Sequence, residues 1–69
     1  MTQHEQRLDH AVKTLEYYMA LPGADPDIMA SMRDLLTDLL HLTEYLHEDA
    51  ENIVRMALMN YDIEQNVCN

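Results

Sequence analysis

The chain has little of several residue types on which common functional sites depend. Its single glycine, Gly23, excludes the glycine-rich loop that cradles phosphate groups. Its single cysteine, Cys68, excludes an internal disulfide, and no group of cysteines and histidines has zinc-finger spacing. Tryptophan and phenylalanine are missing, and six methionines supply adaptable packing in their place. We therefore expect no nucleotide-binding loop, no structural metal and no cofactor.

Basic residues are scarce as well. The chain has four lysines and arginines in total and 13 aspartates and glutamates, which gives a formal net charge of −9. Such a charge opposes contact with a phosphate backbone, so we expect no direct binding to nucleic acid. A basic surface on another protein is the kind of partner that this charge favours, although solubility alone also explains many acidic proteins.

Long apolar runs are missing too. No stretch approaches the roughly 20 apolar residues that a membrane-spanning helix needs. Residues 2–5 are polar, so the start of the chain does not have the pattern of a signal peptide. The sequence predicts a cytoplasmic protein without membrane contact.

The dominant pattern that is present is a helical one over 25–47. Asp25 can cap this helix, and Pro26 suits its first turn, where a missing N–H group costs nothing. Six apolar residues recur at helical spacing and form the central stripe: Ile28, Met32, Leu35, Leu39, Leu42 and Leu46. Neighbouring apolar residues widen this face, so it needs partners on two sides: Met29, Leu36 and Leu40.

Two further helices are predicted on either side of the central one. The first spans about 2–20, begins with a Thr2 and Glu5 capping box, and contains a favourable Asp9 to Lys13 pair. The other spans about 50–65, with Asp49 as its cap. Short turns between the three helices predict an all-α fold, an antiparallel three-helix bundle in a single domain over 1–69.

The side of the central helix opposite its apolar stripe is polar and mostly acidic. We expect it to face solvent: Asp27, Ser31, Asp34, Asp38, His41, Tyr45 and Glu48. Asp34 and Asp38 lie four residues apart, a spacing at which two carboxylates can share Mg²⁺, with His41 and Glu44 nearby. A solvated acidic face is the alternative interpretation. No residue has the sequence context of an activated nucleophile, so no catalytic residue is predicted.

The last helix carries two apolar rows that cannot both pack on one neighbour. One row is Ala50, Ile53, Val54, Ala57, Leu58 and Tyr61. The other, which we term the methionine row, lies roughly half a turn away: Met56, Met59, Ile63 and Val67. A chain of 69 residues buries only about 60% of its surface, so a lone copy is marginally stable. These observations predict contact with a protein partner or a homodimer through the methionine row, with the C-terminal tail as another possible cover.

The segment Leu35 to Glu64, LLTDLLHLTEYLHEDAENIVRMALMNYDIE, resembles the second half of the MazG-type all-α nucleotide pyrophosphohydrolases. The resemblance places Asp34 and Asp38 at the acidic positions of that family's helix, which implies magnesium-dependent hydrolysis. In the first helix the family has an E-x-x-E motif for Mg²⁺, whereas this chain has only Glu16 there. The same hairpin is similar to small helical proteins carried by bacteria and by their phages or plasmids.

The main expectation is a small acidic protein that is not an enzyme and acts through protein contacts. Its interaction residues are predicted to be the methionine row together with Asp34, Asp38 and Glu48. It would serve as an accessory or inhibitor protein of a phage or mobile element, in one version by imitating DNA phosphates. The alternative is a reduced MazG-like hydrolase that uses Mg²⁺.

Overall fold

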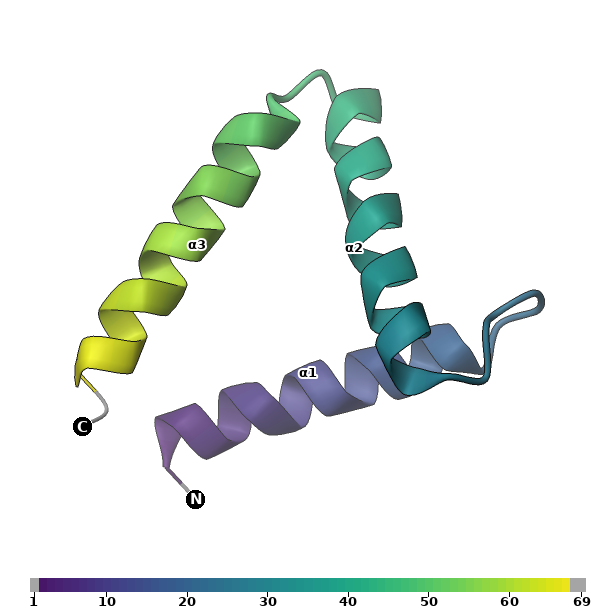
Figure 1. Ribbon diagram of the computed structural model, residues 1–69, viewed down its shortest axis with the longest axis horizontal. Coiled ribbons are helices and arrows are strands. Elements are labelled where there is room, and N and C mark those ends of the chain that lie inside the picture. The colour runs from purple at the N-terminus through teal and green to yellow at the C-terminus, as the bar shows by residue number, and fades with distance from the viewer. Residues whose placement is uncertain (1, 68–69) are drawn as a thin grey trace. The chain divides into compact units, whose positions relative to one another are not determined.

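The computed structural model describes residues 2–67, and the side chains of residues 2–65. It contains three helices, α1 (Gln3–Met19), α2 (Ile28–Tyr45) and α3 (Ala50–Val67), which Figure 1 shows. No strand occurs in residues 2–67. The predicted all-α class is therefore confirmed. Over the same residues, no helix combines the length and apolar character needed to cross a membrane.

Helix α1 begins at the predicted cap. The Thr2 hydroxyl accepts the Glu5 backbone N–H at 3.1 Å and donates to the Glu5 carboxylate at 3.2 Å. This exchange satisfies one of the N–H groups that the first turn leaves without a partner. At the other end the Ala20 N–H is shared between the carbonyls of Glu16 and Tyr17, both at 3.1 Å. The helix thus closes one residue before the end that the sequence predicted.

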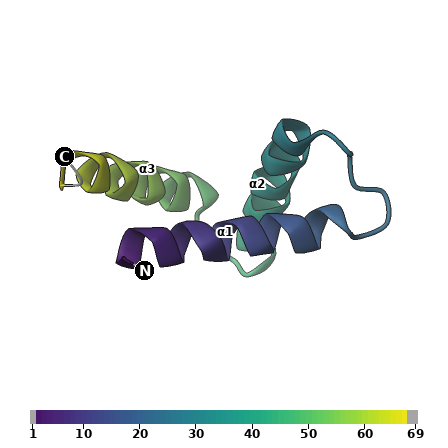
Figure 2. The same cartoon turned by 90° about the horizontal axis from the view of Figure 1, so that it is seen from below.

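The connection between α1 and α2 runs out from the end of α1 and returns to the start of α2 (Figure 2). Its reversal is a turn in which the Ala24 N–H donates to the Leu21 carbonyl at 3.3 Å. Pro22 and Gly23 occupy the two central positions, and Gly23 has φ of +85°. This combination is typical of a type II turn, which needs a positive φ at its second central residue.

Helix α2 begins three residues later than predicted, because Asp27 and not Asp25 is the capping residue. The Asp27 carboxylate accepts the Ala30 N–H at 2.9 Å, and its carbonyl accepts the Ser31 N–H at 2.9 Å. Asp25 instead accepts the Asp27 N–H at 2.8 Å. Pro26 therefore lies in an Asx turn that precedes the helix, and it is not part of the helix itself.

Helices α2 and α3 are joined by a tight turn in which His47 has φ of +62°. The Glu48 N–H donates to the Thr43 carbonyl at 3.0 Å, and the His47 N–H donates to the Glu44 carbonyl at 2.9 Å. These two bonds form a Schellman motif, with a histidine where glycine is usual. Asp49 then caps α3 as predicted, since its carboxylate accepts the Glu51 N–H at 3.0 Å.

The chain divides into two compact units, Met1–Asp38 and Leu39–Asn69. Among the described side chains only two are buried, Leu15 with 8% of its surface exposed and Ser31 with none. The burial of Ser31 corrects the expectation that it faces solvent. Its hydroxyl donates to the Asp25 carbonyl at 2.6 Å, so a small side chain is enclosed where the connection returns to α2.

Candidate protein interaction surfaces

A hydrogen bond between α1 and α2 organises the polar side of the Met1–Asp38 unit. The Tyr18 hydroxyl donates to Oδ2 of Asp38 at 2.5 Å. Beside it lies a hollow of about 350 Å³, lined by Tyr18, Leu21, Pro22, Gly23, Ala24, Asp34 and Asp38. The predicted acidic face of α2 is therefore not wholly solvated, because Asp38 is engaged with α1.

The environment of Tyr18 favours its neutral form. The hydrogen bond to Asp38 raises the pKa of Tyr18 to about 12, and burial and the negative charges of Asp38 and Asp34 act in the same direction. An ionised tyrosine would lose its proton donor and would place a third negative charge beside two carboxylates. Tyr18 is thus a neutral anchor for α2 over the whole physiological pH range.

The structure brings together two of the four residues considered for a metal site. Asp34 and Asp38 line the same hollow, whereas His41 and Glu44 are exposed and belong to the Leu39–Asn69 unit. In the part of the chain that the structure describes, no three side chains of the metal-ligating types are grouped to hold an ion. The hollow therefore offers two carboxylates and a phenol. This set suits a protonated amine or guanidinium group at least as well as a metal ion.

The methionine row is exposed wherever its side chains are described. Met56, Met59 and Ile63 leave 44%, 46% and 53% of their surfaces accessible, and the side chain of Val67 lies outside the described residues. The amide of Asn52 donates weakly to the Met56 sulfur at 3.7 Å. A row of flexible apolar side chains on an acidic helix is a surface that can adapt to a partner.

The other apolar row of α3 borders a shallow hollow of about 420 Å³ in the Leu39–Asn69 unit. Its lining is almost wholly apolar and comes from Leu40, Ala50, Glu51, Val54, Arg55 and Leu58. No described side chain of this unit is buried, and Ile53, Leu58 and Tyr61 are exposed. Residues 39–65 therefore have no enclosed core of their own.

The central stripe of α2 is exposed as well, contrary to the expectation that partners on two sides cover this apolar face. Of its six residues only Leu35 is partly buried, while Ile28, Met32, Leu39, Leu42 and Leu46 are exposed. In the first half of α2 the buried side chain is instead Ser31, and the exposed Asp38 on the same side of the helix accepts the hydrogen bond from Tyr18 of α1. Periodicity identified the apolar face, but it did not identify the face that α1 contacts.

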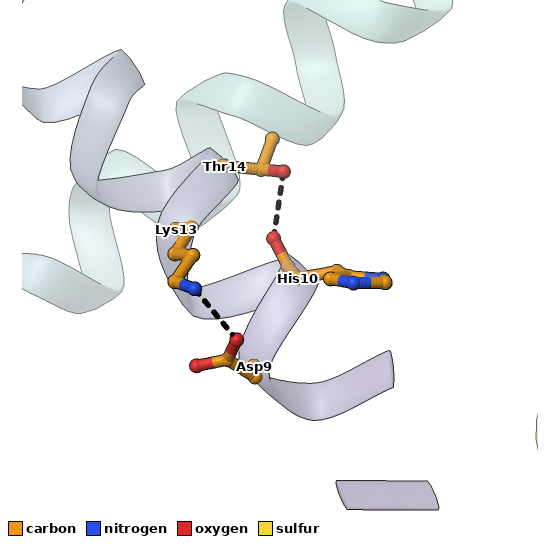
Figure 3. A network of polar contacts seen from close by, with 4 residues as sticks. All are labelled: Asp9, His10, Lys13 and Thr14. Atoms are coloured by element: carbon orange, nitrogen blue, oxygen red, sulfur yellow. Dashed lines mark hydrogen bonds and ion pairs between the residues drawn. The ribbon is translucent and has the colours of Figure 1, made fainter. Parts of the chain in front are cut away.

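One acidic side chain of α1 pairs with a lysine, and exposed acidic side chains on α2 and in the turn after it give the surface its charge. Asp9 pairs with Lys13 at 2.9 Å on the open face of α1, next to the bond from the Thr14 hydroxyl to the His10 carbonyl at 2.8 Å (Figure 3). This pair is exposed and adds only about 0.5 kcal/mol or less. Asp34 and Glu48 are exposed, so the acidic character predicted for α2 remains available to a partner.

Sequence reasoning missed Tyr18 and the enclosed position of Ser31. No functional role was predicted for Tyr18, and nothing in the local pattern connects it with Asp38, 20 residues away. The one usable signal is its position beside the Pro22 and Gly23 turn, which folds α2 back past the end of α1. Compared with family models, with curated proteins and with solved structures, the chain has no match in any of the three.

Proposed function

We propose that this protein is not an enzyme and acts through contacts with other protein chains. The observation that carries the proposal is the exposure of Met56, Met59 and Ile63 on one side of α3. Apolar side chains in a continuous row are expensive to leave in water, and such patches mark binding surfaces in soluble proteins. The three helices would form an antiparallel bundle in which α1 and α3 lie against the flanks of α2, and the chain would form a homodimer.

The partner that we propose beyond a second copy is a protein with a basic surface. The net charge of −9 and the exposed carboxylates of Asp34, Asp38 and Glu48 support this choice. Oppositely charged surfaces accelerate encounter and select the partner more than they raise affinity. In this role the protein would work in the cytoplasm, without a cofactor, as an accessory or inhibitor of the kind that phages and mobile elements carry. An acidic face that imitates DNA phosphates is the most specific form of the proposal.

Site-specific photo-crosslinking tests the proposed role of the methionine row. A photoreactive amino acid at position 59 should cross-link to another protein chain, because Met59 lies within the row. The same amino acid at Gln65, on the opposite side of α3 from the methionine row, is the matched control and should give far less product. Absence of cross-links from position 59, together with light scattering that shows a stable monomer, would refute the proposal.

Salt dependence tests the charge component. Binding to a basic partner should weaken as ionic strength rises, because screening acts on exposed charges. Replacement of Asp34 and Glu48 by their amides should slow association and should reduce this salt dependence. Affinity that does not change with salt would count against the acidic surface while leaving the apolar contact in place.

The magnesium-dependent hydrolase remains the second candidate. The observation in its favour is that Asp34 and Asp38 line one hollow. A carboxylate pair at this spacing could bind Mg²⁺. Oδ2 of Asp38 already accepts a hydrogen bond from the Tyr18 hydroxyl, so Mg²⁺ would compete with this bond. An NMR titration with millimolar Mg²⁺ decides the question, since unchanged carboxylate signals for these two residues would eliminate the candidate.

A further inference from the structure

The central stripe of α2 has the spacing of a coiled-coil core. Ile28, Met32, Leu35, Leu39, Leu42 and Leu46 are separated by four, three, four, three and four residues. This alternation repeats every seven residues, about 3.5 per turn, and it keeps one narrow line of side chains facing a single straight neighbour. Two or more helices that bury such a line against each other are the usual reason for the pattern.

All six positions belong to one continuous helical segment. Helix α2 runs unbroken from Ile28 to Tyr45, and the Leu46 N–H continues its hydrogen bonding by donating to the Leu42 carbonyl at 3.0 Å. Five of the six side chains are exposed. The line is therefore regular along about 27 Å of helix and exposed at every position except Leu35, which is partly buried.

The contacts described for α2 use other sides of the helix. In the Met1–Asp38 unit, Tyr18 of α1 reaches Asp38, which points about 100° away from Leu39. In the Leu39–Asn69 unit, the hollow beside α3 is lined by Leu40, about 100° from Leu39 in the opposite sense. Neither unit encloses the central stripe with its own helices.

We propose that a second copy of this chain docks along the central stripe of α2, with a two-fold axis crossing the helix near Thr37. The inference deepens the proposed function and rests on its homodimer. The stripe is self-complementary about that point, because Leu35 and Leu39, Met32 and Leu42, and Ile28 and Leu46 are equally distant from Thr37 along the chain. A two-fold axis there pairs each apolar layer with an apolar layer of the second copy, as an isologous interface requires.

The exposed area is the size that a stable dimer needs. Seven side chains contribute, and each has between 40% and 65% of its surface exposed: Ile28, Met29, Met32, Leu36, Leu39, Leu42 and Leu46. At roughly 200 Å² of surface for a large apolar side chain, they present on the order of 700 Å² per copy, or about 1,400 Å² in a dimer. Stable interfaces bury about 1,200–2,000 Å² in total.

The arrangement of charge permits this contact between two acidic chains. The stripe contains no charged residue, and Asp34 and Glu44 lie on the far side of α2 from it. The acid closest to the stripe is Asp38, whose carboxylate accepts the Tyr18 hydroxyl. The repulsion between copies is therefore a long-range effect that salt screens, so the dimer should strengthen as ionic strength rises.

Light scattering of the full chain across a range of concentrations is the first test. The wild-type chain should be a dimer, and Leu39→Asp should raise its dissociation constant roughly 100-fold or more, because a buried charge has no partner there. His41→Asp, which adds the same charge on the outer side of α2, is the matched control and should change the constant only a few-fold. If Leu39→Asp has lost its helical circular dichroism, Leu39→Asn replaces it.

Cross-linking keeps the inference testable even if these variants are unstable. In a Cys68→Ser background, Leu36→Cys should be joined to its counterpart by a short thiol-reactive linker, since position 36 lies beside the proposed axis. Thr37→Cys, on the outer side of the same turn, should not be joined. Efficient linkage at both positions, or at neither, would overturn the inference.

The outcomes separate this inference from the proposed function. A dimer that survives Leu39→Asp but is lost in Met59→Asp would overturn the inference and would move the two-fold contact to the methionine row. A wild-type monomer that still cross-links to a different protein from position 59 would also overturn it, while the proposed function would stand. A dimer lost in Leu39→Asp and retained in both His41→Asp and Met59→Asp supports it.

Discussion

Replacement of His47 by glycine should stabilise the protein. His47 holds φ of +62° at the end of α2, where the Schellman motif needs a residue in the left-handed region. Two hydrogen bonds fix this geometry, from Glu48 to Thr43 at 3.0 Å and from His47 to Glu44 at 2.9 Å. Both are backbone bonds that would remain with glycine at position 47, and glycine has no Cβ to strain.

The size of the effect follows from two opposing terms. The left-handed conformation costs a residue with a Cβ about 1–2 kcal/mol. Glycine offsets part of this gain, because it loses more backbone freedom on folding, by about 0.5–1 kcal/mol. The net stabilisation should be about 0.5–1 kcal/mol, which corresponds to a rise in Tm of about 2–8 °C for a chain of this size.

Thermal unfolding followed by circular dichroism measures the change, at one fixed protein concentration because self-association also raises Tm. His47→Ala is the control, since alanine removes the imidazole but retains a Cβ at positive φ. We expect His47→Ala to be neutral or destabilising. If His47→Gly lowers Tm, or if His47→Ala raises it equally, the imidazole and not the backbone conformation governs this turn.

Three further predictions test the Met1–Asp38 unit. Ser31→Ala removes the hydroxyl that donates to Asp25, so the free energy of unfolding should fall by about 1 kcal/mol in chemical denaturation; no loss would mean that this bond adds nothing. Asp27→Ala removes the cap of α2 and should cost about 1 kcal/mol in the same assay, whereas an equal or larger loss in Asp25→Ala would return the cap to that residue. The pKa of Tyr18, raised to about 12 from 10.0, gives stability that is fully present below pH 10.0 and is lost as pH rises through about 12. Asp38→Asn should bring the Tyr18 titration, followed by tyrosinate absorbance, back toward its ordinary pKa, and an unchanged curve would refute the assigned cause.

Local chemistry made the helices predictable. Thr2 and Asp49 were identified as caps because a side-chain oxygen just before a helical apolar pattern can accept a backbone N–H of the first turn. Both residues accept the expected hydrogen bonds. Asp9 and Lys13 were paired for the same reason, since residues four apart on a helix are neighbours. The error at the start of α2 arose because two aspartates flank Pro26, and spacing alone does not choose between them.

Contacts between segments were not predictable in the same way. Helical periodicity marks an apolar face, but it carries no information on which neighbour that face meets. The helix α2 contacts α1 through Asp38 on its polar side, and Ser31 is enclosed there, while Leu39 and Leu42 remain exposed. The bond from Tyr18 depends on a chain reversal whose direction is set by a single turn, and no repeat in the sequence records it.

The two sides of α2 differ in how a substitution would depend on the amount of protein present. A change at Ser31 alters a bond within one chain, so its effect on stability is the same at every protein concentration. A change at Leu39 alters the surface that we propose a second copy covers, so its effect grows as the protein becomes more concentrated and vanishes where the chain is a monomer. On this proposal a host cell that makes few copies would hold a less stable population of the protein than one that makes many, so the level of expression would itself set the supply of folded protein.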